Sequence, residues 1–261
     1  MTDKNSVPAA SPLDALRRYV PLLAWLIVIL VILAIPLKII SEGYLPTDDA
    51  LRHSAKAVSG KPWSDILVLG APFQDQNFVW HDFLRLVHLH MHWETDQLVV
   101  FSVVALFVLA ACSPLPWLRR PEAWLITLTI ITVESGIFSR MMLGRPFLLS
   151  LFVLLTVLCA WQFRGPTSPG WWTFAGLGLL IACCTLVHGI WYLWVLPVAA
   201  FFIAGEFRWG IGLGIAWIAG SFLGAAITGH PIDSLLYAFQ IGERTMGLYQ
   251  NAQRAMVSEL R

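Results

Sequence analysis

The amino-acid sequence predicts an all-α integral membrane protein with about seven transmembrane helices and a large first extracytoplasmic loop that carries amphipathic surface helices. The first reason is composition: 57% of the 261 residues are hydrophobic and only 13% are charged, which excludes an ordinary soluble globular chain. The second is that the apolar residues form long segments, accompanied by 13 Trp that suit two membrane interfaces. The third is one long polar region, 41–97, which holds eight of the 16 acidic residues and five of the seven histidines.

The chain begins with a polar stretch, 1–18, which ends in Arg17-Arg18 and is expected to be a cytoplasmic N-terminal tail. The apolar run that follows, 19–40, is long enough to cross a bilayer. It is too long for the apolar part of a signal peptide and lacks a small-residue cleavage site, so we interpret it as an uncleaved anchor.

The polar region 41–97 is expected to be an extracytoplasmic loop with three short helices. Glycine and proline mark their boundaries at Gly60-Lys61-Pro62 and Gly70-Ala71-Pro72. The predicted helices are about 48–59, 63–69 and 78–92. The first and third are amphipathic and can lie along the membrane surface.

The remaining apolar segments are 97–113, 122–139, 147–163, 171–187, 190–206 and 209–228. With seven crossings, one side collects Arg17, Arg18, Arg119, Arg120, Arg164 and Arg208. The positive-inside rule makes that side cytoplasmic, although the short loop with Arg140 and Arg145 would lie outside. The chain then divides into the tail 1–18, a membrane module 19–235, and an extracytoplasmic tail, or the start of a truncated loop, 236–261.

The stretch LPTDDALRH, 45–53, is the first candidate site, because it places Asp48 and Asp49 at the start of a helix immediately after the first crossing. One interpretation is that the two acids only cap this helix behind Thr47. The other is that the pair is functional, because it follows the first crossing and lies at the bilayer surface, where a lipid-linked substrate would present its head group. His53 closes the stretch and is included among the substrate-binding candidates.

The stretch ESGIFSRMMLGRP, 134–146, is the second candidate site. Glu134 lies in an apolar segment, where a carboxylate is costly, so it is either functional or paired with Arg140. Arg140 and Arg145 are interpreted as phosphate contacts, with interfacial anchoring as the alternative. Arg145 has no acid nearby in sequence, and Gly144 would let the backbone approach a ligand closely. His188, at the end of another apolar segment, could donate a hydrogen bond to a sugar or phosphate.

Three further patterns receive structural interpretations. His81, His88 and His92 share one helix face and could hold a divalent metal, but interfacial histidines are the favoured explanation, so no cofactor is predicted. The cysteines are expected to be packed thiols, and the glycines of 209–228 to serve helix packing. A net charge of +1 without a basic block argues against a nucleic-acid partner.

A crossing followed by an acidic motif in a large first loop (PTDDALRHSAKAVSGKPW), together with the short GRPFLLS turn and a seven-helix total, resembles the GT-C superfamily of polytopic glycosyltransferases. The resemblance covers about residues 15–235. It implies that the donor is a sugar on a polyprenyl phosphate, that Asp48 or Asp49 is the catalytic base, and that transfer inverts the anomeric carbon.

The favoured function is therefore transfer of a sugar from a polyprenyl-phosphate-linked donor to an acceptor at the extracytoplasmic face of a bacterial inner membrane. The lipid bilayer and the lipid-linked donor are the expected partners. Two other classes stay open: a carrier or flippase for a lipid-linked intermediate, and a non-catalytic membrane subunit of a glycan-assembly complex. The carrier would use the same acids and arginines to hold a head group, and the subunit would dock on a partner enzyme through its first loop.

Overall fold

The protein was analysed as a computed structural model that describes residues 12–42, 49–66, 75–118, 120–164 and 169–245, and these residues form helices and no strand. The helices of the first half are α1 Pro12–Glu42, α2 Asp49–Ser59, η1 Trp63–Asp65, α3 Phe78–Met91, α4 Thr95–Cys112, η2 Leu115–Trp117 and α5 Pro121–Val133. Those of the second half are α6 Ser135–Met142, α7 Phe147–Arg164, α8 Trp171–His188, η3 Trp191–Trp194, α9 Val195–Ile203, α10 Phe207–Ala226 and α11 Pro231–Thr245.

All seven predicted apolar segments are helical, but only some of them are long enough to cross a membrane. Four helices are long and apolar enough to cross a membrane: Tyr19–Ser41, Thr95–Trp117, Trp171–His188 and Phe207–Ala226. A fifth crossing is obtained if α5 and α6 are taken together. The two other segments, Phe147–Phe163 and Trp191–Ile203, are shorter apolar helices. The described chain therefore supports a helical protein with four to five candidate spans, and the count of seven is not confirmed.

The apolar segment 122–139 was predicted as one crossing, and the structure divides it into two helices. The chain breaks at Glu134, and α5 and α6 meet at 87°. Glu134 has an extended backbone conformation, and its carboxylate accepts a hydrogen bond from the backbone N–H of Ile137 at 2.6 Å. The acid thus caps a new helix instead of continuing the old one, a local preference that hydropathy does not report.

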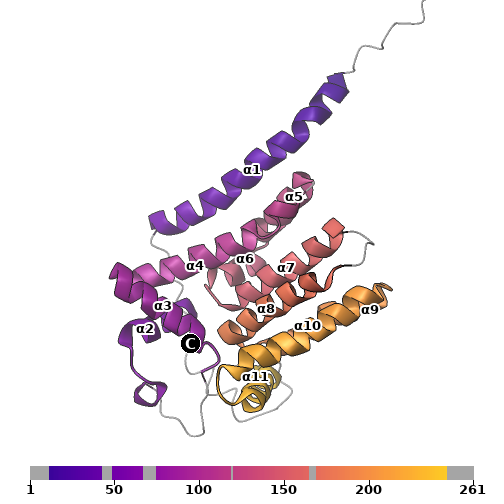
Figure 1. The fold of residues 1–261 in the computed structure, drawn as a ribbon. Helices are drawn as coiled ribbons and strands as arrows, with labels where there is room; N and C mark the ends of the chain where they lie inside the picture. Colours follow the sequence, from indigo (N-terminus) through magenta and orange to yellow (C-terminus); the bar gives the residue numbers. More distant parts are fainter. Residues whose placement is uncertain (1–11, 43–48, 67–74, 119, 165–168, 246–261) are drawn as a thin grey trace, which may run out of the picture.

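The helices of the loop lie at one end of the bundle, together with α11 (Figure 1). We call this end the loop end. The loop end includes the end of α1 and the start of α4, because α2 and α3 lie between these two helices in the sequence. In space, α2 packs against α4, and α3 packs against α4 and α8. Along the bundle, α1 runs beside α4 and α5, and α8 packs against both α7 and α10.

Two of the three predicted loop helices are confirmed. The helix expected over 48–59 is α2, and Gly60 ends it with φ 61°. The helix expected over 78–92 is α3, which ends one residue earlier because His92 adopts the left-handed conformation, φ 55°. Of the predicted helix 63–69, the described part is the single turn η1, and residues 67–69 lie outside the described residues.

The predicted role of glycine in 209–228 is confirmed where α10 crosses α8. A Cβ atom at Gly220 would overlap the carbonyl oxygen of Gly178, and one at Gly224 would lie 2.6 Å from the carbonyl oxygen of Ala182. The two backbones therefore touch, as they do in other small-residue helix pairs. Gly210 faces the ring of Phe202 in α9 instead.

The helix α11 was not predicted, since residues 236–261 were assigned to a tail. Pro231 at its start and Asp233 in its first turn are ordinary helix-start signals. The helix is amphipathic, and it packs against α10 and η3, where the indole N–H of Trp191 donates to the carbonyl oxygen of Leu235 at 2.9 Å. These start signals were sufficient to find it.

Candidate functional site

An ion pair joins the two candidate sites that the sequence singled out. Asp49 is the first residue of α2, and Arg145 lies two residues before the start of α7. Asp49 Oδ2 is 2.5 Å from Arg145 Nε, and Asp49 Oδ1 is 2.5 Å from Arg52 Nη2. The expectation that Arg145 lacks an acidic partner is therefore wrong. Its partner is distant in sequence, and only the packing of the loop on the bundle brings the two together.

Gly144 positions Arg145 through backbone packing. It has φ 62°, and a Cβ atom there would lie 2.8 Å from Cβ of Ala50 and 3.0 Å from Cγ2 of Val103. The chain before α7 therefore sits directly on α2 and α4. This corrects the expected role of Gly144, because the space that it leaves is filled by protein atoms and does not face a ligand.

A second group of polar side chains links α2 to α3. His53 Nδ1 lies 2.6 Å from His81 Nε2, and His81 Nδ1 lies 2.7 Å from Asp75 Oδ2. Both imidazoles are buried, with 3% and 5% of their surface exposed. Asp75 also accepts hydrogen bonds from the indole N–H of Trp63 and the backbone N–H of Asn77, each at 2.9 Å. We call His53, His81 and Asp75 the histidine chain.

The carboxylate at one end of the histidine chain fixes the position of its protons. An ionised Asp75 can only accept, so His81 donates through Nδ1–H and its Nε2 becomes an acceptor. His53 must then donate through Nδ1–H to His81, which leaves His53 Nε2 as an acceptor. The chain thus ends on α2 in a nitrogen that can accept a hydrogen bond.

The surroundings keep His53 neutral and Asp75 ionised. Burial is the main cause that lowers the pKa of His53 from 6.5 to about 2. Positive charge acts in the same direction, first from His81 and then from Arg52 and His188. Burial alone would raise the pKa of Asp75, but hydrogen bonds from His81 and Trp63 bring it below its usual value.

His188, another predicted site residue, lies close to the histidine chain. Its Nδ1 is 3.2 Å from Asn77 Oδ1, and its ring contacts Phe147 at a centroid distance of 6.3 Å. Phe147 is the first residue of α7, and Asn77 directly precedes α3. The end of α8 therefore completes a polar cluster at the loop end. Of the predicted site residues, this cluster brings together Asp49, Arg145, His53 and His188.

The other predicted site residues are placed differently. Asp48 lies outside the described residues. Glu134 and Arg140 are both exposed on or beside α6, and within the described ranges no ion pair or hydrogen bond joins them to one another or to the polar cluster. Glu134 acts as a helix cap, which explains its place in an apolar segment.

The three histidines that were predicted to share one face of α3, His81, His88 and His92, do not lie together in the structure. His81 is turned to His53, whereas His88 Nδ1 lies 2.7 Å from the carbonyl oxygen of Trp93 and His92 is exposed beyond the last helical turn. The part of the chain that the structure describes contains no group of three His, Cys, Asp or Glu side chains arranged to hold a metal. Helical spacing alone could not foresee that α3 ends before His92.

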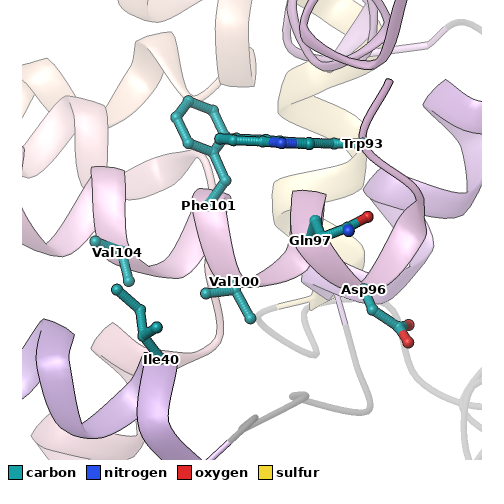
Figure 2. A pocket seen from close by; sticks show the side chains of 7 residues that line it. All are labelled: Ile40, Trp93, Asp96, Gln97, Val100, Phe101 and Val104. Carbon is teal, nitrogen blue, oxygen red and sulfur yellow. The ribbon is translucent and has the colours of Figure 1, made fainter. Parts of the chain in front are cut away.

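A groove of about 580 Å³ lies at the same end of the bundle, between the last turn of α1 and the first turns of α4. Its lining is Ile40, Trp93, Asp96, Gln97, Val100, Phe101 and Val104. Figure 2 shows apolar side chains along most of it, with the polar groups of Asp96 and Gln97 toward one end. Such a shape suits a hydrocarbon chain with a polar end.

Sequence reasoning missed the histidine chain as a unit. It treated His81 as an interfacial residue and gave Asp75 no role, because the contact of His81 with His53 depends on how α2 packs on α3. Asp75 and His81 are close in sequence, which was the one usable signal. No protein-family model, curated protein or solved structure matches this chain.

Proposed function

We propose that the protein is a membrane glycosyltransferase, which moves a sugar from a polyprenyl-phosphate-linked donor to an acceptor hydroxyl at the extracytoplasmic face of a bacterial inner membrane. The observation that carries the proposal is the contact of Asp49 with Arg145. It puts a carboxylate that can accept a proton beside a guanidinium that can hold a phosphate. The resemblance of the first loop to GT-C enzymes supports the same assignment.

The donor phosphate binds at Arg145. Two guanidinium groups surround one carboxylate here, and the side chains of Arg52 and Arg145 are 62% and 39% exposed against 16% for Asp49. An incoming anion therefore meets positive charge first. A guanidinium can bind phosphate through two parallel hydrogen bonds. As the phosphate takes up these donors, the contact of Arg145 with Asp49 loosens and the carboxylate becomes available to the acceptor.

The transfer is a single displacement. The acceptor oxygen attacks the anomeric carbon, the bond from that carbon to the phosphate oxygen breaks, and its electron pair stays on the phosphate held by Arg145. Asp49 takes the proton of the acceptor hydroxyl, with Asp48 as the other candidate for this role. A positioned general base contributes roughly 10²–10⁴-fold in rate, and a guanidinium at the departing phosphate stabilises the charge that develops there.

The groove between α1 and α4 gives the polyprenyl chain a place at the loop end. It begins where α1 ends, at Ile40, and most of its lining side chains come from α4. A lipid in this groove would lie along helices that are long and apolar enough to cross a membrane, with its polar end toward Asp96 and Gln97.

A second candidate, a carrier for a lipid-linked intermediate, is favoured by one observation. The pair α5 and α6 is bent by 87°, and interrupted helices are common at the binding sites of transporters. A carrier would bind the head group at Arg145 but would leave the bond from the sugar to phosphate intact.

The experiment that tests the proposal incubates the purified protein with polyprenyl-phosphate hexoses and pentoses, labelled in the sugar, and a membrane extract as the source of acceptor. We expect labelled product and free polyprenyl phosphate from the wild type, and neither from Asp49→Asn. Asp82→Asn is the matched control, because Asp82 is an exposed acid on α3. Movement of intact donor across proteoliposomes, without any free polyprenyl phosphate, would establish the carrier instead.

A further inference from the structure

The histidine chain begins one helical turn from Asp49. Residues four apart lie on the same face of a helix, so Asp49 and His53 are neighbours on α2. From His53 the hydrogen bonds continue through His81 to Asp75 at N–N and N–O distances of 2.6 and 2.7 Å. A continuous chain of hydrogen bonds therefore runs from His53, one turn along α2 from Asp49, to a second carboxylate in another part of the loop.

We propose that His53, His81 and Asp75 form a proton relay that takes the acceptor's proton from Asp49 and returns it to the departing phosphate. For its substrate this inference rests on the proposed glycosyl transfer, whereas the relay itself is defined by the geometry of the histidine chain.

The relay moves two protons in one direction and the same two back. The carboxyl proton of Asp49 passes to His53 Nε2, while the Nδ1 proton of His53 passes to His81 Nε2. His81 is then an imidazolium whose Nδ1–H still points to the ionised carboxylate of Asp75. When the bond from sugar to phosphate has broken, the hops reverse and the proton reaches the phosphate oxygen through Asp49. The proton that left the acceptor is then on the departing phosphate, and both histidines regain their starting tautomers.

The relay solves a problem that the ion pairs create. A protonated Asp49 would lose its ion pair with Arg52, and with it the negative charge that keeps the start of α2 beside Arg145 while the phosphate is bound. Passing the proton on restores the negative charge of Asp49. His53 cannot keep the proton, because burial first of all, and then the positive charge of Arg52, oppose a cation there. His81 can keep it, because Asp75 lies 2.7 Å away and stabilises an imidazolium as the aspartate of a catalytic triad does.

A purely structural role is the alternative, in which two buried histidines only tie α2 to α3. The substitution Asp75→Asn distinguishes this structural role from the proton relay. The amide oxygen of the substituted side chain can still accept the hydrogen bond from His81 Nδ1–H, so a structural link would survive, but a neutral amide cannot balance an imidazolium. Asp82→Asn and His90→Gln are matched controls: both residues are exposed on α3, and His90 bonds only to the carbonyl oxygen of Leu86 in its own helix.

The experiment combines nitrogen-15 NMR of the histidine side chains with the kinetics of sugar transfer in the same detergent. In the wild type we expect His53 and His81 to be neutral with the proton on Nδ1. For Asp75→Asn we expect kcat to fall by roughly 10²-fold or more with an unchanged KM for the donor, and a changed pH profile. The two controls should keep wild-type kcat.

The relay is refuted if His53 or His81 carries its proton on Nε2 in the wild type, or if Asp75→Asn transfers sugar at the wild-type rate. A parallel loss of kcat and of folded protein in Asp75→Asn would also refute it in favour of the structural link. A wild type that shows the expected tautomers but transfers no sugar from any donor would instead overturn the proposed function.

Discussion

Asp49 begins α2 and Arg145 lies two residues before α7, far away in sequence, yet their side chains meet at the loop end with 2.5 Å between Oδ2 and Nε. This contact fastens the loop helix α2 to the start of α7. It also joins a candidate base to a candidate phosphate ligand. The same pair can therefore report on folding and on ligand binding.

The crossing of α8 and α10 should be intolerant of any side chain at its centre. Gly220→Ala places a methyl group on the carbonyl oxygen of Gly178, and overpacking of this kind costs about 1–3 kcal/mol. Gly176→Ala is the control, since a Cβ atom at this position of α8 meets nothing within 4 Å. We expect thermal unfolding in detergent at a lower temperature for Gly220→Ala and no decrease for Gly176→Ala. Equal midpoints for both variants would mean that the two backbones do not touch.

Burial of neutral His53 should make the protein sensitive to acid. The pKa of His53 is about 2 in the folded protein against 6.5 as its ordinary value. Between these values the unfolded chain binds a proton that the folded chain does not, so the free energy of unfolding decreases as the pH falls. The slope expected from this one group is about 1.4 kcal/mol per pH unit. Asp75, whose pKa is lowered, adds a loss in the same direction at still lower pH.

The measurement is the unfolding midpoint at pH 7.5 and pH 5.0 for the wild type, His53→Gln and His90→Gln. Glutamine does not titrate, so His53→Gln should lose part of the decrease between the two pH values. His90 is exposed, and its variant should behave as the wild type does. If His53→Gln shows the full wild-type decrease, His53 is not buried as a neutral group.

The sequence was sufficient to locate most of the helices. Apolar segments and the breaks at glycine and proline located α2, α3 and every apolar helix, because these depend on local periodicity and chain stiffness. The bend at Glu134 was missed because hydropathy averages over a window and does not register a single capping carboxylate.

The contacts of the site were beyond sequence reasoning because they depend on tertiary packing. Arg145 was chosen for its phosphate chemistry, but its pairing with Asp49 requires Gly144 to lie directly on Ala50. His81 was placed on the correct helix, yet only the packing of α2 on α3 shows that it binds His53. Residue chemistry therefore selected the candidates, and the fold determined which of them lie together.

The proposed orientation places α2 outside the cell membrane and the start of α8 inside. Ser59, at the exposed end of α2, and Gly170, before α8, are suitable labelling positions, because Gly170 has open space around its Cβ position. In a background in which the four native cysteines are replaced by alanine, Ser59→Cys should react with a membrane-impermeant maleimide in intact cells and Gly170→Cys should not. The opposite pattern would invert the orientation.

The central claim is that Arg145, paired with Asp49, holds the donor phosphate, and the affinity for polyprenyl monophosphate tests it most directly. The measurement compares the wild type with Arg145→Lys, Arg145→Ala and Arg140→Ala in one detergent, each variant first shown to be folded. Lysine keeps the charge but cannot form two parallel hydrogen bonds to phosphate. We predict weaker binding for Arg145→Lys, weaker still for Arg145→Ala, and wild-type binding for Arg140→Ala. If folded Arg145→Ala binds polyprenyl monophosphate as tightly as the wild type does, the ion pair with Asp49 is structural and the claim is wrong.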